Sequence, residues 1–105
     1  MSWNTVEEFL AVLPEKAAEN REKLEGADGL YVLRTETRAY CLRVQGGEAA
    51  VLDSCPGEPD VSVEATEQQL LDLLNGKLSP MKALLLGRVK VRGDKKRLLK
   101  LAALA

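Results

Sequence analysis

The chain has 105 residues, of which 46 % are hydrophobic and 30 % are charged, and its formal net charge is −1. This composition predicts one packed domain over residues 1–105, and it excludes both wholesale disorder and a membrane span, since no window approaches the ~20 uncharged apolar residues that a span requires. The chain contains no histidine, so it lacks the side chain most often used for proton transfer near neutral pH and any Ser-His or Cys-His nucleophile, which favours a binding protein over an enzyme.

Two helices are expected at the N-terminus. Asn4 can cap a helix over residues 5–13, which carries acidic side chains in its first turn. Pro14 then breaks or restarts this helix, and a second, strongly charged helix is predicted over residues 14–25. The glycine-containing residues 26–29 follow this helix instead of preceding one, so they do not form a phosphate-binding loop.

The next part of the chain changes to the two-residue alternation of β-strands. Gly46 and Gly47 form a suitable hairpin turn, and the strands around it predict an antiparallel meander. The strands of the meander are residues 30–35, 39–45 and 48–53. After a loop rich in proline and glycine at residues 54–59, residues 60–66 alternate again and predict a fourth strand.

Two short leucine-rich helices come next. Thr66 with Gln69 three residues later resembles a capping box, and the helix that it opens is expected to end at Gly76. Ser79 caps a second helix, which a proline begins and Gly87 ends. Periodicity alone favours ordinary core over a ligand cavity for their apolar side chains, and both interpretations stay open. These side chains are Leu70, Leu71, Leu74, Met81, Leu84 and Leu85.

The chain closes with a strand and a helix. Residues 88–92 alternate, with Val89 and Val91 on one face and basic side chains on the other. A turn at Gly93 and Asp94 leads into a final helix, whose residues at helical spacing form an apolar stripe. The stripe comprises Leu98, Leu101, Ala102 and Ala105.

Charge is unevenly distributed along the chain. Residues 1–76 hold 15 acidic and 6 basic side chains, a balance of −9, whereas residues 77–105 hold 1 acidic and 9 basic, a balance of +8. Either the two parts neutralise each other within one fold, or the basic part forms a face for anionic lipid headgroups or an acidic partner. Under the second interpretation we expect Lys95, Lys96 and Arg97 to contact headgroups or a membrane. Nucleic acid is not expected, because no aromatic side chain interleaves with the basic ones.

The two cysteines are expected to be free thiols. Cys41 and Cys55 could pair, but their spacing matches no motif, and the N-terminus lacks the basic region of a secretory signal, which favours a reducing, cytoplasmic location. Two thiols without histidine make a poor zinc site, so neither a metal nor a cofactor is expected.

Four motifs follow one another in the last part of the sequence. They are the D-V-S-V of residues 60–63, a leucine-rich helix that leads to the N-G-K-L-S-P of residues 75–80, the G-R-V-K-V-R-G-D of residues 87–94, and the final apolar helix. In this order and spacing they resemble the SCP2-like (sterol carrier protein 2) lipid-binding domain. The segment of residues 94–97 departs from the family pattern because it is basic where the family becomes apolar quickly.

The resemblance implies an α+β fold, with a five-stranded, mostly antiparallel sheet and helices packed on one face, enclosing an apolar tunnel for sterols, fatty acids, acyl-CoA or phospholipids. It brings no catalytic residues. The positions that it implies for the tunnel lining are Leu70, Leu71, Leu74, Met81, Leu84, Leu85, Val89, Val91, Leu98 and Leu101.

Two functions are consistent with these observations. The first is non-catalytic binding or transfer of a lipid-like ligand, such as a fatty acyl chain, a sterol or an isoprenoid. The second is an accessory or dimerisation module that buries the same apolar face against a protein partner, for example in isoprenoid-quinone biosynthesis. The protein is then expected to be a monomer or a homodimer.

Overall fold

The structure of the protein is a computed structural model that describes residues 3–104. The helices are α1 (Val6–Glu19), the 3-10 helix η1 (Arg21–Leu24), α2 (Glu67–Leu74), α3 (Pro80–Leu85) and α4 (Lys95–Ala102). The strands are β1 (Gly29–Arg34), β2 (Ala39–Gln45), β3 (Glu48–Leu52), β4 (Val61–Glu64) and β5 (Lys90–Gly93). The predicted meander, fourth strand and last three helices are present, with bounds that differ by a few residues.

The strands form one sheet in the order β3-β2-β1-β4-β5. Three of its four strand pairs are antiparallel, and β1 pairs with β4 in parallel, with Tyr31 opposite Val61. The parallel pair arises because the chain leaves β3 at one edge and returns beside β1 through the loop of residues 53–60. The predicted α+β fold with a mostly antiparallel five-stranded sheet is confirmed, and the sheet is mixed.

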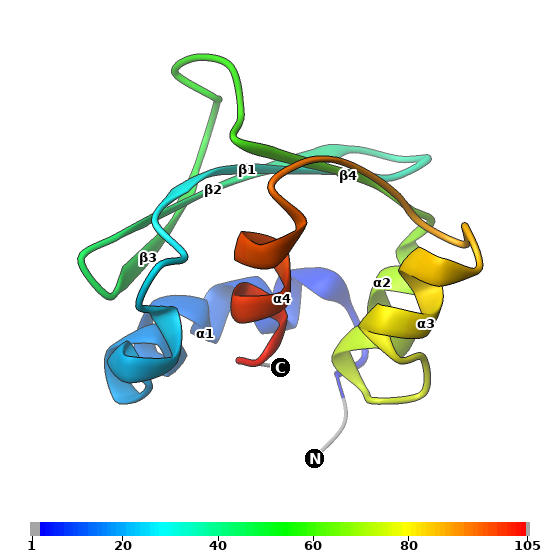
Figure 1. The fold of residues 1–105 in the computed structure, drawn as a ribbon, viewed down its shortest axis with the longest axis horizontal. Coiled ribbons are helices and arrows are strands. Elements are labelled where there is room, and N and C mark those ends of the chain that lie inside the picture. Colours follow the sequence, from blue (N-terminus) through cyan, green and yellow to red (C-terminus); the bar gives the residue numbers. More distant parts are fainter. Residues whose placement is uncertain (1–2, 105) are drawn as a thin grey trace.

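The helices lie together on one face of the sheet, and the loop of residues 53–60 projects on the other side (Figure 1). Alternate strand residues such as Tyr31, Leu42 and Val61 are buried on the helical side, and the apolar stripe of α1 covers them. The stripe comprises Val6, Phe9, Leu10, Leu13 and Ala17. The core is therefore a single layer of side chains between the sheet and its helices.

Helix α1 corrects two predictions about the N-terminus. Thr5, not Asn4, is the N-cap, because its hydroxyl accepts a hydrogen bond from the backbone N–H of Glu8 at 3.1 Å. The helix also continues through Pro14 to Glu19, although proline removes one backbone donor. Since the apolar stripe runs past Pro14 onto the sheet, burial offsets that loss. The separate helix predicted over residues 14–25 is wrong, and its second half forms η1.

The predicted caps of the later helices are confirmed. Thr66 and Gln69 form the complete capping box of α2, and Ser79 caps α3. Asp94 accepts hydrogen bonds from two backbone N–H groups of α4. Gly76 has a φ of 76°, the left-handed conformation expected after a helix end. Ala105, the last residue of the predicted apolar stripe, lies outside the described residues.

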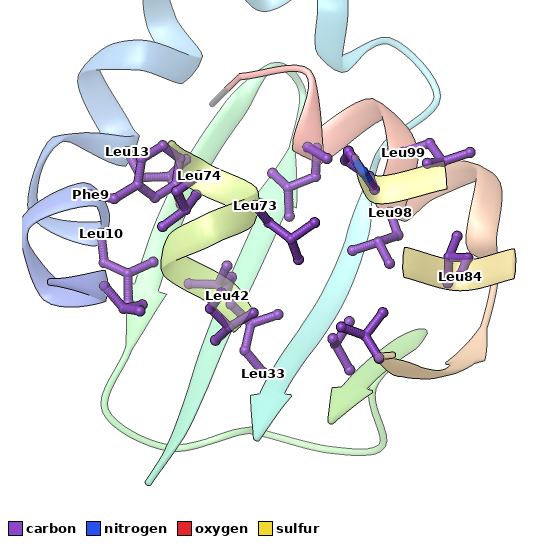
Figure 2. Close-up of a pocket in the computed structure, with 17 residues that line it drawn as sticks. Phe9, Leu10, Leu13, Leu33, Leu42, Leu73, Leu74, Leu84, Leu98 and Leu99 are labelled. Atoms are coloured by element: carbon purple, nitrogen blue, oxygen red, sulfur yellow. The ribbon is translucent and has the colours of Figure 1, made fainter. Parts of the chain in front are cut away.

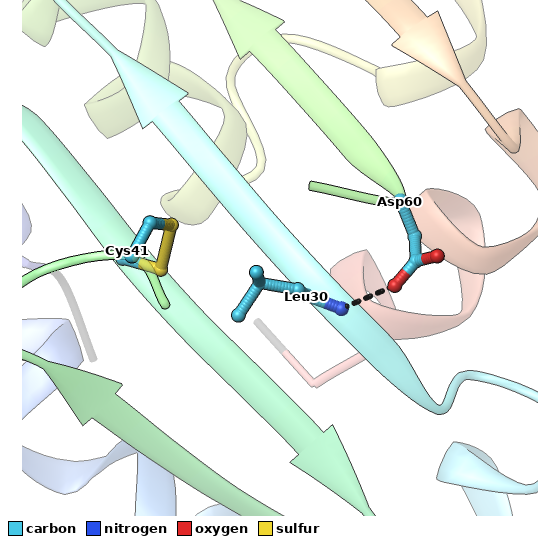
Figure 3. The surroundings of a disulfide bond; sticks show 4 residues. Leu30, Cys41 and Asp60 are labelled. Carbon is cyan, nitrogen blue, oxygen red and sulfur yellow. Dashed lines mark hydrogen bonds between the residues drawn. A yellow bond between two sulfur atoms is a disulfide. The ribbon is translucent and has the colours of Figure 1, made fainter. Parts of the chain in front are cut away.

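The structure joins Cys41 and Cys55 in a disulfide, which corrects the expectation of free thiols (Figure 3). The loop after β3 folds back over the sheet face opposite the helices and brings the two Cα atoms to 5.6 Å, within the range that a disulfide spans. The other end of the loop is also fixed, because Asp60 and Leu30 exchange two hydrogen bonds of 2.8 Å. One of these is the bond from the Leu30 N–H to the Asp60 carboxylate in Figure 3.

Candidate functional site: an apolar cavity between sheet and helices

A cavity of about 110 Å³ lies between the sheet and helices α1 to α4 (Figure 2). Its lining consists of 17 apolar residues and includes no titratable side chain among the described residues. They are Val6, Phe9, Leu10, Leu13, Leu33, Leu42, Val63, Leu70, Leu73, Leu74, Pro80, Leu84, Val89, Leu98, Leu99, Leu101 and Ala102. Such a lining can accept an apolar group but offers no side chain for a directional hydrogen bond.

Each wall of the cavity follows from the period of its element. Strands β1, β2 and β4 contribute one inward-facing residue each, namely Leu33, Leu42 and Val63, and Leu33 and Leu42 lie at the sheet in Figure 2. Helix α2 contributes residues 70, 73 and 74 and α4 contributes residues 98, 101 and 102, both at the i, i+3, i+4 spacing of one helical face, and Leu99 of α4 also lines the cavity. Leu13 of α1 lies on one side of the cavity and Leu84 of α3 on the opposite side.

Helix α2 is held at both of its ends. At its C-terminal end, the Trp3 N–H donates to Asn75 Oδ1 at 2.6 Å, and Asn75 Nδ2 donates to the Trp3 carbonyl at 2.9 Å. At its N-terminal end, Glu67 Oε1 accepts hydrogen bonds from the hydroxyls of Thr35 and Thr37 at 3.1 and 3.0 Å. These contacts tie α2 to the N-terminal segment and to the β1–β2 hairpin.

A buried tyrosine adds to the anchoring of α2. The Tyr40 hydroxyl lies between Glu7 of α1 and Glu67, with 2.8 Å to the Glu67 carboxylate. Burial, followed by the hydrogen bonds to Glu7 and Glu67, raises the pKa of the Tyr40 hydroxyl well above its usual value. Since neither the hydroxyl nor the carboxylates line the cavity, this group acts as a structural clamp between α1, α2 and the sheet.

Helix α4 is also fixed by polar contacts. Arg97 Nη1 lies 3.5 Å from the Asp60 carboxylate and Arg97 Nε lies 3.2 Å from that of Asp94. The Tyr31 hydroxyl donates to the Ala27 carbonyl and lies 3.3 Å from that of Arg97. Burial raises the pKa of this hydroxyl to about 12, although the Arg97 charge opposes the shift. Helix α4 is thus bound to β1 and to the start of β4.

Helix α3 differs from its neighbours in its anchoring. Its cap bond, from the Lys82 N–H to the Ser79 hydroxyl, is local, and the described residues show no side-chain hydrogen bond or ion pair from α3 to another element. It contacts the rest of the protein through apolar side chains, chiefly Ala83, which is fully buried, and Leu84. Of the cavity walls, α3 is the one held by apolar packing alone.

The structure brings six of the ten predicted lining residues together around the cavity, and a ligand contact at any of them stays a prediction. The six are Leu70, Leu74, Leu84, Val89, Leu98 and Leu101. The other four lie outside its lining, which corrects their predicted position. Leu71 and Val91 are partly buried against the core, whereas Met81 and Leu85 are 51 % and 78 % exposed. Because residues 80 and 84 face the cavity, residues 81 and 85 fall on the outer side of α3.

Sequence reasoning missed the lining residues from α1 and from the strands. They are Val6, Phe9, Leu10, Leu13, Leu33, Leu42 and Val63. Leu73, Pro80, Leu99 and Ala102 were missed on the later helices. Except for Leu99, which lies off the apolar stripe of its helix, these positions are inward-facing by helical or strand periodicity, but the same pattern describes a filled core. Sequence periodicity therefore identifies inward-facing residues, but it cannot distinguish the lining of a cavity from a filled core.

Few direct contacts join the charges of the basic part, residues 77–105, to those of the acidic part, residues 1–76. In the described residues, one ion pair joins the two parts, between Arg97 and Asp60. Lys100 Nζ donates to the Glu25 carbonyl at 2.6 Å, while Lys95 and Lys96 are exposed. The predicted contact of Lys95, Lys96 and Arg97 with headgroups stays a prediction.

Residues 3–104 contain neither a candidate metal site nor a candidate membrane span. No cluster of three or more histidine, cysteine, aspartate or glutamate side chains is arranged to hold a metal ion in this part of the chain. None of its helices combines the length and apolarity needed to cross a bilayer.

Comparison with known proteins places these features in context. Residues 6–105 match the SCP-2 sterol transfer family. Peroxisomal multifunctional enzyme A of Dictyostelium discoideum is 23 % identical over 97 % of this chain, which spans 24 % of that protein's length. The chain thus corresponds to about a quarter of that curated relative.

Two solved structures share the fold. The sterol carrier protein domain 2 of Helicoverpa armigera has a TM-score of 0.76 at 24 % identity, covering 99 % of this chain and 91 % of that one. The UbiJ-SCP2 ubiquinone synthesis protein has a TM-score of 0.73 at 18 % identity, covering 94 % of this chain and 84 % of that one. At these identities the likeness concerns the arrangement of helices and strands.

Proposed function

Because the chain belongs to the SCP-2 sterol transfer family, we propose that it binds the apolar part of a lipid-like ligand in the cavity between its sheet and helices. The ligand class is a fatty acyl chain, a sterol or an isoprenoid. The observation that carries this proposal is the uniformly apolar lining, to which all four α-helices and the sheet contribute. Burial of each methylene contributes about 0.8 kcal/mol, so a chain of several methylenes binds without any polar contact.

The size of the cavity determines how such a ligand enters. Pockets for small molecules usually measure about 300–1,000 Å³, and an apolar cavity of about 150 Å³ is enough for benzene. At about 110 Å³ the cavity has to widen before it holds a whole acyl chain or sterol. Since α2 and α4 are held by polar contacts and α3 is not, the widening is assigned to a movement of α3.

The proposed role is non-catalytic. The chain has no histidine, and the lining contains no group able to transfer a proton or to attack a substrate. Selection between ligands then rests on the length and shape of their apolar parts, and a polar headgroup stays at the surface.

Uptake of a fluorescent fatty acid by delipidated protein tests this function. We expect saturable binding that unlabelled fatty acid, sterol or isoprenoid alcohol displaces, and native mass spectrometry of the purified protein is expected to detect a bound lipid. Absence of both uptake and co-purifying lipid would refute the proposal.

The second candidate is an accessory module within a larger assembly. The extent of the match favours it, because the Dictyostelium enzyme contains the matched region as about a quarter of its length. An accessory module would form a stable dimer or complex and keep its cavity empty. Size-exclusion chromatography and native mass spectrometry separate the two candidates, since a lipid carrier is expected to be a monomer with bound lipid.

A cytoplasmic location also belongs to the proposal. Reducing compartments disfavour disulfides, so the state of Cys41 and Cys55 in protein taken from cells bears on it directly. Thiol labelling under denaturing conditions tests this location: two reduced cysteines would support it, and a fully formed Cys41–Cys55 disulfide, as in the structure, would contradict it.

A further inference from the structure

Helix α3 and the residue after it expose large apolar side chains on the side away from the cavity. Met81, Leu85 and Leu86 are 51 %, 78 % and 66 % exposed, and we call these three residues the α3 surface. Among the described residues, Val51 is the one other large hydrophobic side chain with comparable exposure. Clustered exposure of this kind is typical of an interaction site, whereas single exposed apolar residues are ordinary.

The sequence around the α3 surface is basic and contains no acidic residue. From Leu73 to Gly93 there is no aspartate or glutamate, and there are five basic side chains. They are Lys77, Lys82, Arg88, Lys90 and Arg92, all of them exposed. None of them forms an ion pair in the described part of the chain. The apolar side chains of the α3 surface are thus accompanied by positive charge, of which Lys82 and Arg88 lie within three residues of Leu85.

We propose that the α3 surface docks on an anionic lipid bilayer. In this arrangement Leu85 and Leu86 insert among the acyl chains, and Lys82 and Arg88 contact the anionic headgroups. A second copy of the chain fits the surface less well, because a symmetric contact would bring the same basic residues face to face. An anionic bilayer offers acyl chains to the exposed leucines and negatively charged headgroups to the basic side chains.

The two sides of α3 connect this docking with the cavity. Pro80 and Leu84 line the cavity, while the α3 surface lies on the opposite side of the same short helix. Insertion of Leu85 and Leu86 into lipid would displace α3, the cavity wall that has no side-chain hydrogen bond or ion pair to another element in the described residues. This step rests on the proposed lipid-binding function, but docking itself does not, so the two are tested separately.

Co-sedimentation with vesicles tests the docking. The wild-type protein is expected to bind vesicles of phosphatidylcholine and phosphatidylserine in equal parts, to bind pure phosphatidylcholine weakly, and to dissociate as salt is raised. Leu85→Ser/Leu86→Ser is expected to weaken vesicle binding roughly tenfold or more. Lys82→Gln/Arg88→Gln is expected to weaken it roughly tenfold. The matched control, Lys23→Gln/Arg43→Gln, removes the same charge from exposed positions on η1 and β2 and is expected to leave binding nearly unchanged.

A second measurement reports insertion directly. In Leu86→Trp the new indole is expected to shift its emission to the blue on anionic vesicles and to be quenched by brominated lipid, relative to the parent protein with its single Trp3. Uptake of a soluble fluorescent fatty acid by the serine and glutamine variants is expected to equal that of the wild type, since none of the four positions lines the cavity.

Several results would overturn the docking. They are equal binding to both vesicle types, equal losses in the Lys23→Gln/Arg43→Gln control, or a dimer or acidic-protein complex that Leu85→Ser/Leu86→Ser dissociates in a protein that does not bind vesicles. Fatty-acid uptake without vesicle binding refutes docking and leaves the lipid-binding function intact. Vesicle binding without fatty-acid uptake and without co-purifying lipid supports docking and refutes that function.

Discussion

Filling the cavity by Leu73→Trp is the most direct test of whether a ligand binds in this space. Leu73 projects from α2 toward the middle of the lining in Figure 2, so an indole at this position enters the cavity. At about 24 cal/mol per Å³, an empty volume of 110 Å³ corresponds to about 2.6 kcal/mol of lost stability. Because an indole does not match the cavity in shape, we expect recovery of about 1 kcal/mol in the free energy of unfolding.

The assay combines urea unfolding with titration of a fluorescent fatty acid. Leu73→Trp is expected to unfold at equal or higher urea concentration than the wild type and to lose fatty-acid uptake. Leu85→Trp is the matched control, because Leu85 is 78 % exposed and outside the lining, and it is expected to change stability by less than about 0.5 kcal/mol and to keep uptake. Destabilisation of Leu73→Trp by about 1–3 kcal/mol with unchanged uptake would show that the region is filled core.

Three further predictions concern the scaffold. Gly93→Ala is expected to lower the free energy of unfolding by about 3 kcal/mol or more in the urea assay, because the new Cβ would lie 2.0 Å from the backbone carbonyl oxygen of Asp60. Gly76 also has a positive φ, but the space around it is open, so Gly76→Ala is expected to lower the free energy of unfolding by only about 1 kcal/mol. Reduction of the Cys41–Cys55 disulfide, whose sequence separation is 14, should lower stability by about 3 kcal/mol, measured by urea unfolding with and without reductant. Burial raises the pKa of the Tyr31 hydroxyl from 10.0 to about 12 in the folded protein, so the stabilisation by the protonated hydroxyl is complete below pH 10.0 and is lost as the pH rises toward 12. Urea unfolding and tyrosinate absorbance, measured together, are expected to show this decrease in stability. Stability that stays constant over this pH range would contradict the burial of the hydroxyl.

The sequence predicted best where local chemistry decides the structure. The Thr66 capping box, the Ser79 cap and the Gly46-Gly47 turn each depend on residues within a few positions of one another, and all three are present. Pro14 shows the opposite case. Its local preference is to end a helix, and the burial of the stripe on α1 against a sheet made by later residues overrides that preference.

The sequence predicted that the lining of the candidate site is apolar, but it identified only some of the residues that form this lining. Leucine density marked α2, α3 and α4, but a six-residue helix with apolar side chains on both sides does not reveal which side faces inward. Leu84 lines the cavity and its neighbour Leu85 is exposed, and only the packing of α3 on α4 decides between them. Pairing of Cys41 with Cys55 likewise depends on the path of a loop that local sequence does not specify.

The position of Asp60 determines whether the C-terminal part can be treated as a unit. Asp60 bonds to Leu30 through its backbone and its carboxylate, its carbonyl accepts the Asp94 N–H at 3.3 Å, and Arg97 pairs with it. Strand β4 has β1 as one of its two neighbours. Residues 60–105, which carry the family motifs, therefore have no complete sheet of their own. A fragment of residues 60–105 would not fold on its own, so a graft of this region into another protein must include the first 59 residues.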